Sequence, residues 1–119
     1  MTEKIKNFRD LNIWKLGMEI ASDIYRETKQ FPQQELYGLS SQIRRAAVSM
    51  HSNIAEGFAR KHNKEYKQFL YICLGSCAEF ETQIEIACSQ GYWTEDIKSV
   101  FLEKTNHLSR MTMSLLKCL

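Results

Sequence analysis

Hydrophobic residues recur along this chain at intervals of three and four positions, with polar residues between them. This spacing is typical of amphipathic helices, and it occurs in four successive segments. No segment alternates between apolar and polar residues for long, so no strand is expected. The pattern predicts helices at about residues 11–30, 37–60, 63–90 and 94–118, within one domain spanning 1–119. Short connections place sequential helices antiparallel, which predicts an all-α, up-down-up-down antiparallel four-helix bundle.

Residues that favour helix ends mark the expected boundaries. Asp10, Asn63 and Thr94 are the expected N-caps of the first, third and fourth helices, because short polar side chains satisfy free backbone N–H groups. Pro32 cannot continue a helix, so it lies in the first connection. Gly91 is expected to end the third helix.

The apolar positions define an expected core face on each helix. The face of the first helix consists of Trp14, Met18, Ala21, Tyr25 and Thr28, with Ile13, Gly17, Ile20 and Ile24 beside it. The seam of the second helix consists of Leu39, Ile43, Ala46, Met50, Ile54 and Gly57. In the fourth helix Lys104 interrupts the apolar seam, and its ammonium group is expected to reach solvent.

A line of polar residues runs beside the apolar seam of the second helix, and the third helix has a similar polar flank. Charged groups at the edge of a core must be paired and hydrogen-bonded. An ion pair of Arg45 with Glu56 or Glu79 would meet that requirement, with Asn53 and Ser49 bridging it. We therefore predict a structural network between helices rather than a ligand site. The residues of this polar stripe are Arg45, Ser49, Asn53, Glu56, Ser76 and Glu79.

Metal and catalytic sites are disfavoured by the residue spacing. Ferritin-like bundles bind metal through Glu-x-x-His motifs, and the sequence contains none. Cys73 and Cys77 share a helix face without a histidine at ligand spacing, and burial makes such thiols unreactive. No strand precedes GLS or GSC, as a nucleophile elbow requires, and there is no glycine-rich phosphate loop. We expect no metal, no cofactor and no enzymatic activity.

Composition and charge are those of an ordinary globular protein. The 119 residues are 44% hydrophobic and 25% charged, and 16 basic against 14 acidic residues give a net charge of +2. Overall charge therefore does not indicate a nucleic-acid or membrane partner. The uncharged run at 69–78 is too short to span a membrane, and the N-terminus lacks an apolar signal region. Four cysteines without a signal peptide indicate reduced thiols and a cytoplasmic location.

Basic residues nevertheless cluster in the segment RKHNKEYK, which contributes Arg60, Lys61, Lys64 and Lys67. On a monomer such a cluster is usually a solvated loop. Repeated around a ring, it would form a positive surface that releases counterions from phosphate backbones. Such binding would be independent of nucleic-acid sequence and strongly dependent on salt.

Three segments carry a resemblance to a known family. FRDLNIWKLGMEIASDIY, FPQQELYGLSSQIRRAAVSMHSNIAEGFAR and YKQFLYICLGSCAEFETQIEIA resemble the four-helix-bundle proteins of the S23 class. Members of this class are encoded, among other places, in intervening sequences of bacterial 23S ribosomal RNA genes. The most specific pattern lies in the second segment, and the third adds Gly75, Ser76, Glu79 and Glu81.

The resemblance implies a left-handed bundle that assembles as a homopentameric ring, with no established catalytic activity. It places Arg45, Ser49, Asn53 and Glu56 on the family signature, which favours a scaffolding role for them. A related branch, the accessory protein of diversity-generating retroelements, binds nucleic acid and a reverse transcriptase through a positively charged ring.

We therefore expect a noncatalytic, cytoplasmic homo-oligomer that binds RNA or DNA nonspecifically through Arg60, Lys61, Lys64 and Lys67. The alternative is a protein-binding adaptor for an enzyme partner such as a reverse transcriptase, without direct nucleic-acid binding. The small residues of the second helix and the exposed Tyr71 and Leu74 are candidates for the subunit interface.

Overall fold

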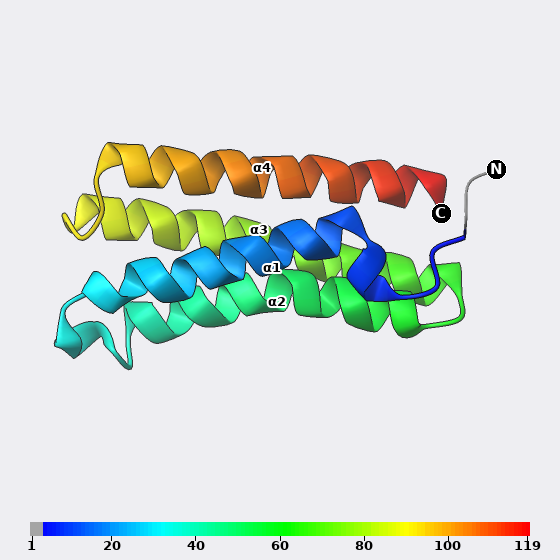
Figure 1. Ribbon diagram of the computed structural model, residues 1–119, viewed down its shortest axis with the longest axis horizontal. Coiled ribbons are helices and arrows are strands. Elements are labelled where there is room, and N and C mark those ends of the chain that lie inside the picture. The colour runs from blue at the N-terminus through cyan, green and yellow to red at the C-terminus, as the bar shows by residue number, and fades with distance from the viewer. Residues whose placement is uncertain (1–3) are drawn as a thin grey trace.

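The computed structural model describes residues 4–119, which form an elongated bundle of 48 × 25 × 19 Å. The long helices are α1 (Asn12–Glu27), α2 (Leu39–Ala59), α3 (Asn63–Ser89) and α4 (Glu95–Cys118). Three short 3-10 helices accompany them: η1 (Phe8–Asp10), η2 (Thr28–Gln30) and η3 (Gln33–Glu35). The four long helices run up, down, up and down (Figure 1), and the all-α prediction is confirmed.

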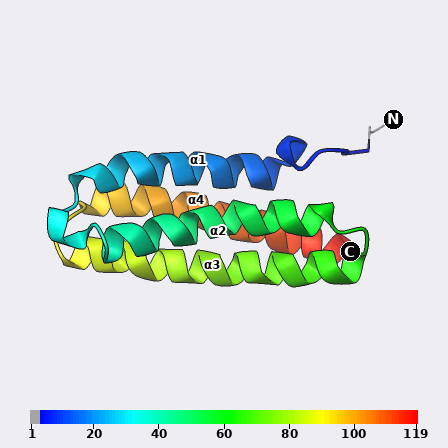
Figure 2. The same cartoon turned by 90° about the horizontal axis from the view of Figure 1, so that it is seen from below.

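Each long helix packs against two others, in the order α1, α2, α3, α4 and back to α1. The α2–α3 pair has the most extensive contact. The N-terminal segment, the α2–α3 turn and the C-terminus lie at one end of the bundle (Figures 1 and 2). The α1–α2 and α3–α4 connections lie at the other end.

The helix ends agree only partly with the sequence prediction. Thr94 caps α4 by accepting a hydrogen bond from the Ile97 N–H, as predicted. Gly91 follows α3 with φ of +78°, a left-handed conformation that glycine adopts without steric cost. The Asp10 prediction is wrong, because Asp10 belongs to η1 and α1 begins at Asn12. Asn63 is already the first residue of α3, and His62 occupies the cap position.

The predicted core seam of α2 is buried along its whole length. On α1 the core face is rotated from the prediction: Ile13, Gly17, Ile20, Ala21 and Ile24 are buried. Met18 and Tyr25 are 45% and 47% exposed, so their predicted core positions are wrong. The reason is a close crossing of α1 and α2, where a Cβ atom on Gly17 would lie 2.6 Å from His51 Cβ. Only glycine permits this approach, so the buried face of α1 passes through Gly17 and leaves Met18 outside it.

The α4 seam contains two threonines that the apolar pattern did not predict. Thr105 and Thr112 are fully buried. Their hydroxyl groups donate to the carbonyls of Phe101 and Leu108 at 2.7 and 2.8 Å, so burial leaves no polar atom unsatisfied. The Lys104 side chain was expected to reach solvent, and in the structure its ammonium group also forms ion pairs with α1. Its Nζ lies 2.9 Å from Asp23 Oδ2 and 3.5 Å from Glu19 Oε2.

Candidate nucleic-acid interface

The α2–α3 turn brings the four predicted basic residues to one end of the bundle. Arg60 and His62 have extended backbone conformations, and these reverse the chain between two long helices. The Arg60 N–H donates to the Gly57 carbonyl at 3.1 Å, which closes the last turn of α2. Lys61 and Lys64 are exposed at the turn, and Lys67 is half-buried one turn into α3.

Arg60 is the most constrained of these cations. Its guanidinium carbon lies 4.9 Å from the centre of the Phe69 ring. This cation–π contact fixes the side chain across the α2–α3 boundary while the residue remains exposed. No ion pair shorter than 4.0 Å joins Arg60, Lys61, Lys64 or Lys67 to a carboxylate in residues 4–119, so their charges face solvent uncompensated by direct contact.

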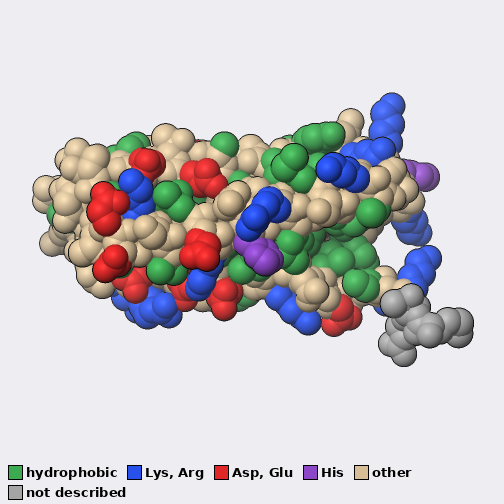
Figure 3. All heavy atoms as spheres, turned by 90° about the horizontal axis from the view of Figure 1, so that it is seen from above, with side chains coloured by type: hydrophobic (Ala, Val, Ile, Leu, Met, Phe, Trp, Pro, Cys, Tyr) green, Lys and Arg blue, Asp and Glu red, His purple; other side chains and the backbone are tan. Residues whose placement is uncertain are grey.

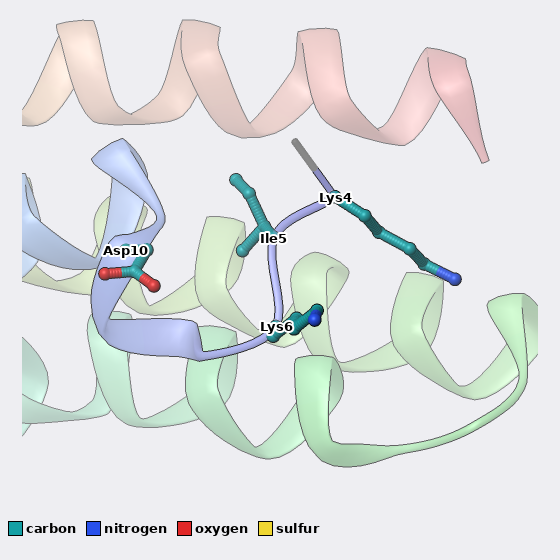
Figure 4. Close-up of a pocket in the computed structure, with 4 residues that line it drawn as sticks. All are labelled: Lys4, Ile5, Lys6 and Asp10. Atoms are coloured by element: carbon teal, nitrogen blue, oxygen red, sulfur yellow. The ribbon is translucent and has the colours of Figure 1, made fainter. Parts of the chain in front are cut away.

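The topology adds lysines that the local cluster did not predict. Lys4 and Lys6 are exposed on the N-terminal segment, beside a hollow of about 510 Å³ that Ile5 and Asp10 also line (Figure 4). The Lys4 side chain extends away from Asp10 (Figure 4). Lys117 lies in the last turn of α4, at the same end. In an up-down bundle the start of the first helix, the turn between the second and third helices and the end of the fourth helix lie at the same end. The predicted topology was therefore sufficient to place these lysines beside the α2–α3 turn.

We call this region the basic end: Lys4, Lys6, Arg60, Lys61, Lys64, Lys67 and Lys117. Asp10 and Glu65 are acidic residues in the same region. At the opposite end the helix termini and connections carry both signs of charge: Glu27, Glu35, Glu95 and Asp96 with Arg26, Lys29 and Lys98. On the face shown in Figure 3, acidic side chains gather toward that opposite end, and basic side chains border the end with the N-terminal segment. The small net charge therefore hides an excess of positive charge at the basic end, while acidic and basic residues accompany each other at the opposite end.

The polar stripe lies along the boundary of α2 and α3. Ser49 and Ser76 hydroxyl oxygens are 2.8 Å apart, and Asn53 Nδ2 donates to the Ser49 carbonyl at 2.8 Å and hydroxyl at 3.0 Å. Glu79 accepts a hydrogen bond from Gln83 Nε2 at 3.2 Å. The structure thus joins Ser49, Asn53 and Ser76, and it joins Glu79 to Gln83 on the same flank of α3.

The expected ion pair of the polar stripe is not formed. Among residues 4–119, neither Glu56 nor Glu79 lies within 4.0 Å of the Arg45 guanidinium. Arg45, Glu56 and Glu79 are exposed, so water solvates their charges and no pairing is required. Arg45 and Glu79 instead border an open hollow of about 520 Å³ between α2 and α3.

The described chain contains several chemically reactive side chains, among them four cysteines and three histidines. No group of three His, Cys, Asp or Glu side chains within residues 4–119 has a metal-binding arrangement. Cys73 and Cys77 are buried, and the contact with Cys77, together with burial, raises the pKa of the Cys73 thiol. No helix in the described part of the chain is both long and apolar enough to cross a membrane.

Comparison with known proteins identifies a family and solved structures of similar fold. Residues 9–114 match the family model described as 23S rRNA-intervening sequence protein. A crystal structure from Bacteroides thetaiotaomicron VPI-5482, of a protein of unknown function from the S23 ribosomal protein family, is similar with a TM-score of 0.82. The two chains are 22% identical, and the match covers 88% of this chain and 98% of the other. No curated protein matches this chain.

Proposed function

The chain belongs to the 23S rRNA-intervening sequence protein family, and from this premise we propose that it is a noncatalytic bundle that assembles with copies of itself and binds RNA or DNA nonspecifically. Its location would be the cytoplasm, and the basic end would be the binding surface. The observation that carries the proposal is the meeting of three separate chain segments, all bearing exposed lysine or arginine, at one end of the bundle.

The form of the basic end favours phosphate contacts over base recognition. Its cations are on flexible stems, and only Arg60 is held by an aromatic ring. Such side chains neutralise phosphates without selecting a base sequence. In a homo-oligomer, such as the pentamer expected from the family resemblance, several copies of this end would act on one strand and multiply its affinity.

A filter-binding measurement at two salt concentrations tests this proposal. Labelled single-stranded RNA and duplex DNA should be retained at low salt and released as salt rises. Arg60→Glu/Lys64→Glu should abolish retention, because both cations lie in the basic end. The neutral pair Arg60→Gln/Lys64→Gln should reduce the slope of log K against log salt by about two, roughly one for each phosphate that is no longer neutralised.

A control with the same charge change removes cations elsewhere. Lys15→Glu/Lys29→Glu alters two exposed lysines of α1 and η2, and retention should change little. Absence of retention at low salt, or equal losses in both double variants, would refute binding at the basic end.

A second candidate function is that of a protein-binding adaptor, for example for a reverse transcriptase. The supporting observation is an apolar surface hollow of about 200 Å³ between α3 and α4, bordered by Tyr71, Leu74, Met113 and Leu116. Tyr71 is 63% and Met113 is 49% exposed in the single chain. This alternative would be supported if the wild type does not retain nucleic acid but binds a protein partner, and if Tyr71→Glu loses that partner.

A further inference from the structure

A smaller hollow of about 230 Å³ lies at the end of the bundle opposite the basic end. It is formed where α1 passes through η2 and η3 into the first turns of α2. Its polar wall consists of Thr28, Lys29, Gln33, Ser40 and Arg44, and three apolar residues complete it. None of these residues belongs to the basic end, so the inference below does not depend on the proposed function.

Arg44 is held in position by neighbours that leave its charge uncompensated. Its Nε donates to Thr28 Oγ1 at 2.8 Å, and its guanidinium carbon lies 5.0 Å from the centre of the Tyr25 ring. Thr28 Oγ1 donates in turn to the Ile24 carbonyl at 2.6 Å, which orients the threonine as an acceptor for the arginine. Within residues 4–119, no carboxylate lies within 4.0 Å of this guanidinium. Its terminal N–H groups are therefore available to a ligand.

Ser40 adds a second hydrogen-bonding group to the hollow. The residue is only 3% exposed, and it lines the hollow. Its hydroxyl group has no hydrogen-bond partner among residues 4–119, and the oxygen is not sealed from the hollow, so it can contact a bound ligand. Ser40 also lies in the first turn of α2, where free backbone N–H groups favour a negative charge.

The chemistry of the wall selects the charge of the ligand. Arg44 and Lys29 are cations, and Gln33 and Ser40 add hydrogen-bond donors. No carboxylate lines this hollow, in contrast to the hollow between α2 and α3, where Glu79 accompanies Arg45. Donors from two helices and their connection suit a tetrahedral oxyanion, which accepts hydrogen bonds in several directions. We propose that this hollow binds a phosphate group.

The surroundings favour a small phosphate compound over a nucleic-acid strand. The same connection carries Glu27 and Glu35, which do not line the hollow but give this end of the bundle negative charge. Glu35 is engaged elsewhere, with Oε1 accepting from the Leu39 N–H and Oε2 from the Tyr92 hydroxyl. Acidic and basic residues alternate here, so a polyanion meets no continuous positive surface, whereas one phosphate group can reach the local donors. The ligand class is inorganic phosphate or a small phosphate monoester.

Titration of the full-length chain with inorganic phosphate tests the site, with chloride used to keep ionic strength constant. Calorimetry measures the affinity, and amide NMR shifts of Ser40 and Arg44 locate the binding. Arg44→Gln should weaken binding about tenfold, since it removes a charged hydrogen-bond donor. Ser40→Ala and Lys29→Gln should each weaken it about threefold, and the exposed Lys29 can be changed without disturbing the core.

The matched control is Arg45→Gln, which removes the adjacent arginine from a different hollow and should leave phosphate affinity unchanged. Arg60→Glu/Lys64→Glu should also bind phosphate normally, which separates this site from the basic end. Circular dichroism confirms that each variant is folded. The proposal is overturned if phosphate gives no saturable signal, if Ser40→Ala and Lys29→Gln both bind as the wild type does, or if Arg45→Gln weakens binding equally.

Two further ligands identify the source of the phosphate. Glycerol phosphate should compete with inorganic phosphate at the Ser40 and Arg44 amides. An oligonucleotide that has only internal phosphodiesters should not compete there. Competition by the oligonucleotide alone would overturn the assignment to a small phosphate compound.

Discussion

The hydroxyl oxygens of Ser49 and Ser76 lie 2.8 Å apart and connect α2 to α3 beside the core. Asn53, one turn after Ser49, extends this contact by donating to the Ser49 hydroxyl and carbonyl. Ser76 is buried, and Ser49 and Asn53 are half-buried, so these bonds form where water has limited access. The middle of the polar stripe is thus a hydrogen-bonded contact between α2 and α3. The charged residues Arg45 and Glu56 lie outside this contact, and each is exposed to solvent.

Asn53→Leu should lower the stability of the bundle by about 1 kcal/mol, because it removes two hydrogen bonds from Ser49. Urea unfolding monitored by circular dichroism measures the change, and light scattering reports the mass of the assembly. Asn106→Leu, at an exposed position of α4, is the control and should leave both quantities unchanged. If Asn53→Leu also changes neither quantity, the stripe has no structural role.

Gly57→Ala should destabilise the protein by about 1–3 kcal/mol through overpacking. The added Cβ would lie 2.8 Å from Phe69 Cβ and 3.3 Å from the Tyr66 carbonyl oxygen, so α2 and α3 would have to separate. Gly75→Ala is the matched control, because its Cβ would meet nothing within 4 Å. Higher helix propensity should make Gly75→Ala more stable by about 1 kcal/mol. Equal unfolding midpoints for the two variants would contradict this assignment of the close crossing.

Acidification should destabilise the fold through His51. Burial lowers the pKa of His51 from 6.5, and its ring packs against Trp14 at 5.8 Å between centres. The unfolded chain therefore binds a proton below about pH 6.5 that the folded chain resists, so stability falls as pH decreases through this window. The slope for one group is at most about 1.4 kcal/mol per pH unit.

Urea midpoints at pH 7.5 and pH 5.5 measure this effect of His51. His51→Gln should show a smaller loss between the two pH values than the wild type. His62→Gln is the control at an exposed histidine and should retain the full loss. A wild-type loss no larger than that of His51→Gln would show that other groups cause it.

Asp23→Asn should weaken the contact between α1 and α4 by about 1 kcal/mol at pH 7. Burial raises the pKa of Asp23, but its hydrogen bonds to Lys104 and Arg26 outweigh burial and lower the pKa below 3.8. The stabilisation is therefore present above pH 3.8 and is lost as pH falls through the lower pKa of the folded state. Thermal unfolding at pH 7 and pH 2.5 should show the gap between wild type and variant narrowing with acid. Glu103→Gln, at an exposed residue without an ion pair in the described chain, should show no gap.

Tyr71→Glu should reduce the mass of the assembly if the hollow between α3 and α4 is a subunit contact. The substitution places a charge where Tyr71 and Met113 present apolar surface, and burying an unpaired charge is unfavourable. Light scattering at several protein concentrations measures the mass. Val100→Glu, at an exposed apolar position in the other half of α4, should leave the mass unchanged. An unaltered mass in Tyr71→Glu would assign the contact to another face.

The sequence pattern was sufficient for the parts of the fold that depend on periodicity. The α2 seam is buried as predicted because its apolar residues follow a single line with little interruption. The α1 face was misassigned because the largest side chains were taken as the most buried. In the structure α1 and α2 approach each other closely at Gly17, and a larger side chain at that position would clash with His51. Thr105 was missed because its internal hydrogen bond, which permits burial, is invisible in a hydropathy pattern.

The candidate site was predictable where its residues are neighbours in sequence. Arg60, Lys61, Lys64 and Lys67 belong to one turn, so their proximity needs only the helix boundary. Lys4 and Lys117 join them through topology, which the helix count implied. The hollow at Arg44 depends on the path of the η2–η3 connection, and no periodic rule specifies that path.

The excess of positive charge at one tip gives each molecule a direction. A polyanion at a distance would attract this tip more strongly than the other, so the bundle would rotate before the first contact forms. Encounter would then be end-on, and the long sides of the helices would stay free for neighbouring copies. Added salt would remove this alignment along with the attraction, which slows productive collisions as well as weakening the final complex.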